Sequence, residues 1–161
     1  MKQDITQDIK KMKTNKIFFS FDIKNNHDKA IKNNDGFNYN HCGIILDNNQ
    51  TLEATSKEGV IISNLDKYDN YHIYKVEKEE EINIKEYLNE PYDHLYLGKK
   101  GYYCSNLVNK IFNLIKEHPL VFEDKKYWQE YYQKYNMDIP DNILGTNPNS
   151  LSKSKKIKRI K

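Results

Sequence analysis

The stretch CSNLVNKIFNLI, residues 104–115, decides the fold class because it has the clearest periodicity in the chain. Its apolar side chains recur at steps of three and four residues, which is the pattern of one buried face of an α-helix. The residues on this face are Cys104, Leu107, Val108, Ile111, Phe112 and Ile115. The pattern predicts a helix that begins near Cys104, and Pro119 is predicted to end it.

Short β-branched and aromatic runs precede this helix and predict strands. They occupy residues 16–21, 41–47, 50–55, 60–63 and 71–76. Asn48 and Asn49 predict a tight turn between the second and third strands, because Asn tolerates positive φ. Residues 24–40 are predicted as a long loop, residues 77–90 as an exposed acidic helix and residues 124–135 as a helix with one aromatic side. Central strands with helices around them predict an α+β fold with an antiparallel sheet.

The chain length of 161 residues is that of a single domain. No apolar run approaches the roughly 20 residues that span a bilayer, and the first fifteen residues contain no apolar signal-peptide core. We therefore expect a cytoplasmic protein as the chain stands. The expected organisation is a flexible lead-in at residues 1–15, a domain at residues 16–152 and a basic tail at residues 153–161.

The predicted tail accounts for the positive charge of the chain. It holds six basic residues and no acid, so the rest of the chain sums to −3 although the whole chain sums to +3. A mildly acidic body argues against nucleic-acid binding. The tail is predicted to be solvated, with at most weak contact to an anionic surface. The sequence gives no prediction of the oligomeric state.

The two cysteines, Cys42 and Cys104, leave three possibilities open: one disulfide, two buried thiols, or one reactive thiol. The four histidines other than His41 show no ligand spacing, and no CxxC pair is present, so no metal site is expected. Cys42 follows His41 directly, and adjacent strand residues point to opposite faces. Cys42 is therefore interpreted as a buried core thiol that does not share a site with His41 unless the strand bulges.

Cys104 falls in the first turn of the predicted helix. Helix N-termini lower the pKa of a thiol and offer N–H groups to an oxyanion. His41 opens a strand beside a long polar loop, where an imidazole can act as a base. Taken one at a time, each residue is explained more simply as part of the core, since buried Cys is common.

Glu53 lies between two apolar residues of a predicted strand, where an unpaired carboxylate would be costly. One role for it is to orient the imidazole of His41. A two-residue turn at Asn48 and Asn49 would pair Ile44 with Glu53, which puts Glu53 and His41 on opposite faces. A bulge or a longer turn would be needed to bring them together.

Residues 39–60 and 101–112 resemble two motifs of the NlpC-type papain-like cysteine hydrolases. In that superfamily a His begins an H-x-G-I strand and a polar residue follows twelve positions later, and His41 and Glu53 have this spacing. The segment GYYCSNLVNKIF is similar to the Y-C-S-E-L-V start of the helix that bears the nucleophile. Here the Cys follows the His, which resembles the circularly permuted YiiX/YaeF-like amidase branch, as does GTNP at residues 145–148.

The resemblance covers about residues 16–152 and implies a permuted papain-like fold with the nucleophile at a helix N-terminus. It implies that Cys104 is the nucleophile and His41 the general base. Glu53 would orient His41, and Tyr103 would lie beside the oxyanion hole. The chain departs from the pattern at Asn106, where Glu is usual, and it lacks the Gly-Asp that precedes the first strand.

The activity implied by the resemblance is that of an amidase, peptidase or acyl-ester hydrolase that uses a Cys-His-Glu triad and needs no cofactor. Its substrates would be cell-wall peptides or lipid-linked acyl groups. The alternative is a catalytically inactive papain-like binding module tethered by the basic tail.

Overall fold

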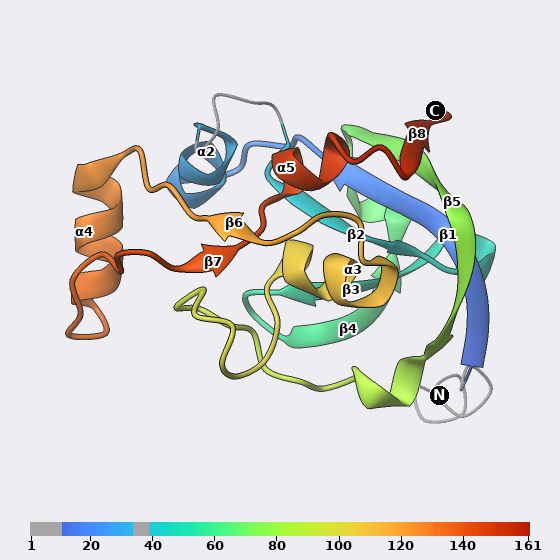
Figure 1. Ribbon diagram of the computed structural model, residues 1–161, viewed down its shortest axis with the longest axis horizontal. Helices are drawn as coiled ribbons and strands as arrows, with labels where there is room; N and C mark the ends of the chain where they lie inside the picture. Colours follow the sequence, from blue (N-terminus) through green and yellow to red (C-terminus); the bar gives the residue numbers. More distant parts are fainter. Residues whose placement is uncertain (1–10, 34–38) are drawn as a thin grey trace.

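The computed structural model describes residues 11–33 and 39–161, and its fold is α+β as the sequence predicts (Figure 1). Six strands form the main sheet in the order β4-β3-β2-β1-β5-β8, with antiparallel neighbours throughout. In chain order the elements are β1 (Lys11–Ser20), α2 (Asn26–Asn33), β2 (His41–Ile45), β3 (Gln50–Thr55), β4 (Gly59–Asn64), β5 (Tyr71–Asn83), α3 (Cys104–Phe112), β6 (His118–Pro119), α4 (Lys125–Gln133), β7 (Leu144–Gly145), α5 (Pro148–Ser152) and β8 (Ile157–Arg159).

Helix α3 covers one face of the sheet and contacts β2, β3 and β5 (Figure 1). Its apolar stripe joins the inward-facing residues of the strands in the main core. Fully buried members of this core are Ile17, Phe19, Cys42, Ile44, Leu52, Ala54, Val60, Ile84, Leu107, Val108 and Leu151. Helix α3 ends at Asn113, which adopts a left-handed conformation (φ 51°), so the helix stops before the predicted Pro119.

A second core lies away from the sheet, beside α2 and α4, and we call it the aromatic cluster. Its buried members are Ala30, Tyr96, Tyr103, Phe122, Trp128, Tyr131 and Tyr132. Asp124 caps α4 by accepting a hydrogen bond from the Tyr127 N–H (3.1 Å). The predicted aromatic helix is confirmed, and its rings form a core.

The predicted loop at residues 24–40 contains helix α2, while residues 34–38 lie outside the described residues. The Asn25 side chain accepts a hydrogen bond from the Asp28 N–H (2.8 Å), and Asp28 in turn accepts one from the Lys24 N–H (2.9 Å). These side-chain bonds satisfy main-chain groups at the start of the helix. The Asn- and Asp-rich composition that suggested a loop therefore marks a helix start.

The predicted acidic helix at residues 77–90 is wrong. Strand β5 continues to Asn83, and a single 3₁₀ turn at Ile84–Glu86 follows it. Lys13 of β1 lies opposite Glu81 of β5, and opposite charges on paired strands stabilise the extended form. Since β1 begins at Lys11, residues 11–15 of the predicted lead-in are part of the sheet; residues 1–10 are outside the described residues.

The basic segment at residues 153–161 also differs from the solvated tail that its composition suggests. Residues 157–159 form β8, which extends the sheet by pairing Ile157 with Val76 and Arg159 with Tyr74 of β5. Main-chain pairing thus orders the segment, while lysines such as Lys158 stay exposed. In the part of the chain that the structure describes, no helix is long and apolar enough to cross a bilayer.

Candidate active site

The turn between β2 and β3 brings His41 and Glu53 to the same face of the sheet. Asn48 and Asn49 both have positive φ, as predicted, but the turn includes Asp47 and has three residues. Ile44 therefore pairs with Leu52, and the same register puts Glu53 opposite Gly43, two residues from His41. The sequence required either a bulge or a longer turn to bring His41 and Glu53 together, and the structure has the longer turn.

Gly43 makes room for this arrangement. A Cβ atom at this position would lie 2.6 Å from the ring of Phe18 and 3.0 Å from the Cβ of Glu53. Phe18 in turn packs near the His41 ring, with centroids 5.9 Å apart. The glycine that follows the strand-opening histidine therefore lets a buried carboxylate and an aromatic ring pack closely beside the imidazole.

Glu53 is fully buried and each of its carboxylate oxygens has a partner. Oε1 lies 3.0 Å from His41 Nε2 and 3.1 Å from Lys67 Nζ, and it accepts a hydrogen bond from the Tyr68 hydroxyl. Oε2 accepts a hydrogen bond from the Thr51 hydroxyl. Burial raises the pKa of Glu53, but the bonds from His41 and the two hydroxyls outweigh it and lower the pKa to about 2. Glu53 is thus held as a carboxylate.

His41 is the first residue of β2, and its side chain remains one fifth exposed at the end of the strand. Its ring stacks on Tyr68, with centroids 5.6 Å apart. Burial lowers the pKa of His41, but hydrogen bonds to Cys104 and Glu53 raise it to about 10. The imidazole is therefore protonated near neutral pH and lies between a thiol and a carboxylate.

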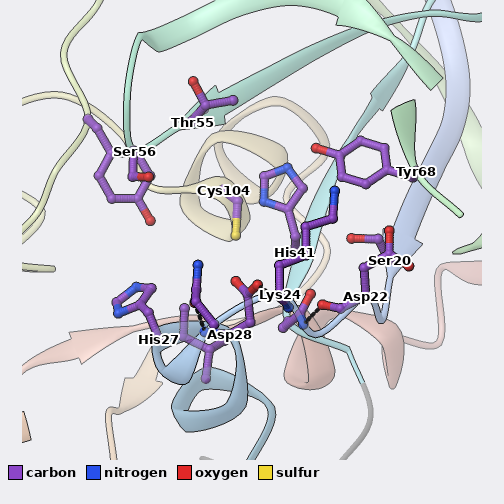
Figure 2. A pocket seen from close by; sticks show the side chains of 15 residues that line it. Ser20, Asp22, Lys24, His27, Asp28, His41, Thr55, Ser56, Tyr68 and Cys104 are labelled. Atoms are coloured by element: carbon purple, nitrogen blue, oxygen red, sulfur yellow. Dashed lines mark hydrogen bonds between the residues drawn. The ribbon is translucent and has the colours of Figure 1, made fainter. Parts of the chain in front are cut away.

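Cys104 is the first residue of α3, and its sulfur lies beside the His41 ring (Figure 2). Hydrogen bonding from Cys42 lowers the pKa of the Cys104 thiol; burial opposes this, and the bond to His41 adds to the lowering. The result is a pKa well below the ordinary value. The lowered pKa of Cys104 and the raised pKa of His41 both favour a thiolate–imidazolium pair at the N-terminus of α3.

Cys42 lies against this pair, although the sequence predicted that it would not share a site with His41. It is a free, fully buried thiol in the main core, as predicted, and burial raises its pKa. It faces α3, where its thiol and main chain reach the Cys104 sulfur. His41 reaches the same sulfur because it lies at the very end of the strand, so no bulge is needed.

A cavity of about 260 Å³ opens in front of Cys104 and His41, and we call it the polar cavity because most of the residues that line it have polar side chains. Most of its lining residues come from the β1–α2 segment, from α2 and from the ends of β2 and β3, and Tyr68, Tyr92 and Cys104 complete the wall. Figure 2 shows the labelled ones around the sulfur. They include Asp22, Lys24, His27, Asp28, Ser56 and Tyr68. The paired thiol and imidazole are thus accessible to a ligand.

Comparison with known families tests the resemblance. The sequence model described as "Permuted papain-like amidase enzyme, YaeF/YiiX, C92 family" matches residues 16–161. The chain belongs to this family. The family is one of cysteine hydrolases of the amidase class, and its permuted order agrees with His41 preceding Cys104. No curated protein matches the chain.

A solved member has the same fold. The crystal structure described as metalloprotein YiiX from Escherichia coli O157:H7 matches with a TM-score of 0.73 at 17% sequence identity, covering 93% of this chain and 97% of that one. In residues 11–33 and 39–161 of the present chain, no three His, Cys, Asp or Glu side chains are grouped so that they could hold a metal ion. We assign no step to a metal.

One departure from the family pattern, Asn106, can now be located beside Tyr103. Asn106, where Glu is usual, accepts a hydrogen bond from the Tyr103 N–H (2.8 Å) and so caps α3. The Tyr103 hydroxyl accepts a hydrogen bond from the Thr146 N–H (3.1 Å). Since its N–H and hydroxyl are both engaged, Tyr103 contributes to the site as a buried wall next to Cys104.

Three further residues act on the site through Glu53, and the sequence analysis missed them. The sequence could have indicated Thr51 as a partner of Glu53, because it lies two residues before Glu53 and hence on the same face of β3. It gave no such indication for Lys67 and Tyr68, since they follow β4 and reach Glu53 only through the fold.

Proposed function

We propose that this member of the permuted papain-like amidase family hydrolyses an amide or ester bond with Cys104, His41 and Glu53. The observation that carries the proposal is the continuous contact from Glu53 through His41 to the sulfur at the start of α3, with 3.0 Å between Glu53 Oε1 and His41 Nε2. Nucleophile, base and orienting group in this order are the arrangement of covalent acyl-transfer catalysis.

Cys104 attacks the substrate carbonyl as a thiolate and forms a tetrahedral intermediate. The Cys104 N–H belongs to the first helical turn, whose N–H groups have no acceptor within the helix, and it donates to the developing oxyanion. The His41 imidazolium then gives its proton to the leaving amine or alcohol as the bond to the carbonyl carbon breaks, which leaves a thioester.

Hydrolysis of the thioester uses the same groups in reverse. Neutral His41 takes a proton from a water molecule, the resulting hydroxide attacks the thioester carbonyl, and the Cys104 thiolate leaves. Glu53 stays ionised and holds Nε2 of His41, so the other ring nitrogen faces the sulfur. The products are a carboxylic acid and the amine or alcohol.

The direct test is alkylation of the thiols with iodoacetamide, with the modified residue located by mass spectrometry. We expect Cys104 to react at neutral pH at least tenfold faster than an unperturbed thiol, because more of it is thiolate. His41→Ala should lower this rate. Cys42 is the internal control, since it is buried and its pKa is raised.

Activity is tested on a panel of amides and 4-nitrophenyl esters, with Cys104→Ala as the matched inactive variant. Cleavage that survives in Cys104→Ala would contradict the proposal. An ordinary alkylation rate that His41→Ala leaves unchanged would instead favour the inactive binding module.

A further inference from the structure

A second, apolar pocket adjoins the other side of Cys104. Its volume is about 40 Å³, and it shares Cys104, Ile31 and Tyr92 with the polar cavity. The aromatic cluster supplies four of the residues that line it, and the other wall residues are Ser105, Leu120, Thr146, Asn147 and Pro148. The cluster residues that line it are Tyr96, Tyr103, Phe122 and Trp128. The thiol therefore lies where a polar and an apolar compartment meet.

The position of His41 tells which part of a substrate each compartment receives. His41 lines the polar cavity, whereas the apolar pocket is lined by Tyr103, Cys104 and Ser105 at the start of α3. A leaving group must lie within reach of the acid that protonates it. The leaving amine or alcohol therefore occupies the polar cavity, and the acyl group occupies the apolar pocket.

The size of the apolar pocket limits the acyl group. A cavity needs about 10–15 Å³ to hold one water molecule, so 40 Å³ accepts roughly three groups of that size. The walls resist widening because they are packed rings: Trp128 lies against Phe122 with centroids 5.1 Å apart, and Tyr96 lies against Tyr103 at 5.2 Å. A long hydrocarbon chain does not fit in this space. The acyl group that fits this pocket is therefore compact and apolar.

We infer that the apolar pocket beside Cys104 is the acyl subsite, and that the substrate joins a compact acyl group of about two to four carbons to a polar amine or alcohol held in the polar cavity. The inference rests on the proposed function and narrows it: it selects substrates with compact acyl groups and excludes the long lipid acyl chains that the family resemblance also implied.

The kinetic test uses 4-nitrophenyl esters that differ only in the acyl group. We expect kcat/KM for butyryl to exceed that for decanoyl at least tenfold. Leu120→Ala removes a wall and should shift the decanoyl-to-butyryl ratio about tenfold toward decanoyl. Val121→Ala is the matched control: Val121 is the next residue along the chain but is half exposed and does not line the pocket, so its ratio should stay within twofold.

A binding test separates this inference from the proposed function. Trp128 is the only tryptophan of the chain, so its fluorescence reports on the pocket even in Cys104→Ala, which cannot turn over. We expect N-butyrylglycine to give a saturable change and N-decanoylglycine to give none below its micelle concentration. Equal fluorescence responses to the two ligands would overturn the inference. So would a decanoyl-to-butyryl ratio that Leu120→Ala leaves unchanged. If Cys104→Ala still abolishes cleavage in either case, the proposed hydrolase function stands. An alkylation rate independent of His41 would overturn the hydrolase, whatever the fluorescence shows.

Discussion

The two regions that meet at Cys104 are built in different ways. The reacting groups sit on regular elements, at the ends of β2 and α3 and within β3, and hydrogen bonds to a buried carboxylate position them. The aromatic cluster comes from α2, from α4 and from the segments that precede α3 and α4, and rings packed edge-to-face or tilted hold it together. Its hydroxyls are tied to main-chain carbonyls, as in the bonds from Tyr131 to His94 and from Tyr132 to Leu95.

We expect the region around Glu53 to determine the reactivity of Cys104, and the aromatic cluster to determine which substrates bind. A triad needs atoms fixed to within about half an ångström, which strands and helix ends provide. A pocket wall needs only shape and an apolar surface, which can change without disturbing the triad. Substitutions in the first region should therefore alter the reactivity of Cys104, and substitutions in the second should alter stability or substrate preference.

The largest expected effect is that of Cys104→Ala, which should lower kcat by a factor of at least about 10³ on any substrate cleaved. The side chain is buried but small, so the midpoint of thermal unfolding should change little. Enzyme kinetics and differential scanning calorimetry on the same preparation check both points. An unfolded variant would not be informative, and Cys104→Ser serves as the second, nearly isosteric change.

Glu53→Gln should lower kcat/KM by about 10²-fold and shift its pH dependence. The active thiolate–imidazolium pair exists between the lowered pKa of Cys104 and the pKa of His41, raised to about 10, so activity should fall as pH rises through that value. Removing the charge of Glu53 lowers the pKa of His41, so the loss of activity at alkaline pH should begin at a lower pH. A pH series of alkylation rates measures this without substrate, and an unmoved limb would show that Glu53 does not act on His41.

The positions of Cys104 and His41 could be predicted for physical reasons that are local, whereas their catalytic roles were implied only by the family resemblance. Periodicity placed Cys104 at the start of a helix, and the β-branched run placed His41 at the start of a strand. The position of Glu53 needed the register of the hairpin, and a single extra turn residue, Asp47, reversed the face on which it falls. Turn length depends on tertiary packing as much as on the two asparagines.

Other features depended on partners distant in sequence. The acidic end of β5 is extended because it pairs with β1, where Lys13 lies opposite Glu81, and a short segment alone does not reveal such a partner. The same applies to Tyr68, which reaches Glu53 from the loop after β4. Cys42 was placed correctly in the core, but its contact with Cys104 depends on how α3 crosses β2, which periodicity does not specify.

Tyr68→Phe should have a smaller effect than Glu53→Gln. It removes one donor to Glu53 Oε1 but keeps the ring that stacks on His41. One hydrogen bond to a charged acceptor is worth about 1.5–3 kcal/mol, and only part of this reaches the imidazole, so we expect about a tenfold slower alkylation of Cys104. If Tyr68→Phe left the rate and its pH profile unchanged, Tyr68 would be a packing residue rather than a positioning residue.

Tyr132→Phe is the matched change in the aromatic cluster and should have the smallest effect on reactivity. It also removes one buried hydroxyl, the donor to the carbonyl of Leu95 (2.8 Å). The unfolding free energy should fall by about 1 kcal/mol, measured by urea denaturation, while the alkylation rate of Cys104 should stay within twofold of the unsubstituted protein. The pair Tyr68→Phe and Tyr132→Phe thus deletes the same atom on each side of the nucleophile. If both variants slowed alkylation equally, the aromatic cluster would be coupled to the thiolate, and the division between chemistry and selectivity would be wrong.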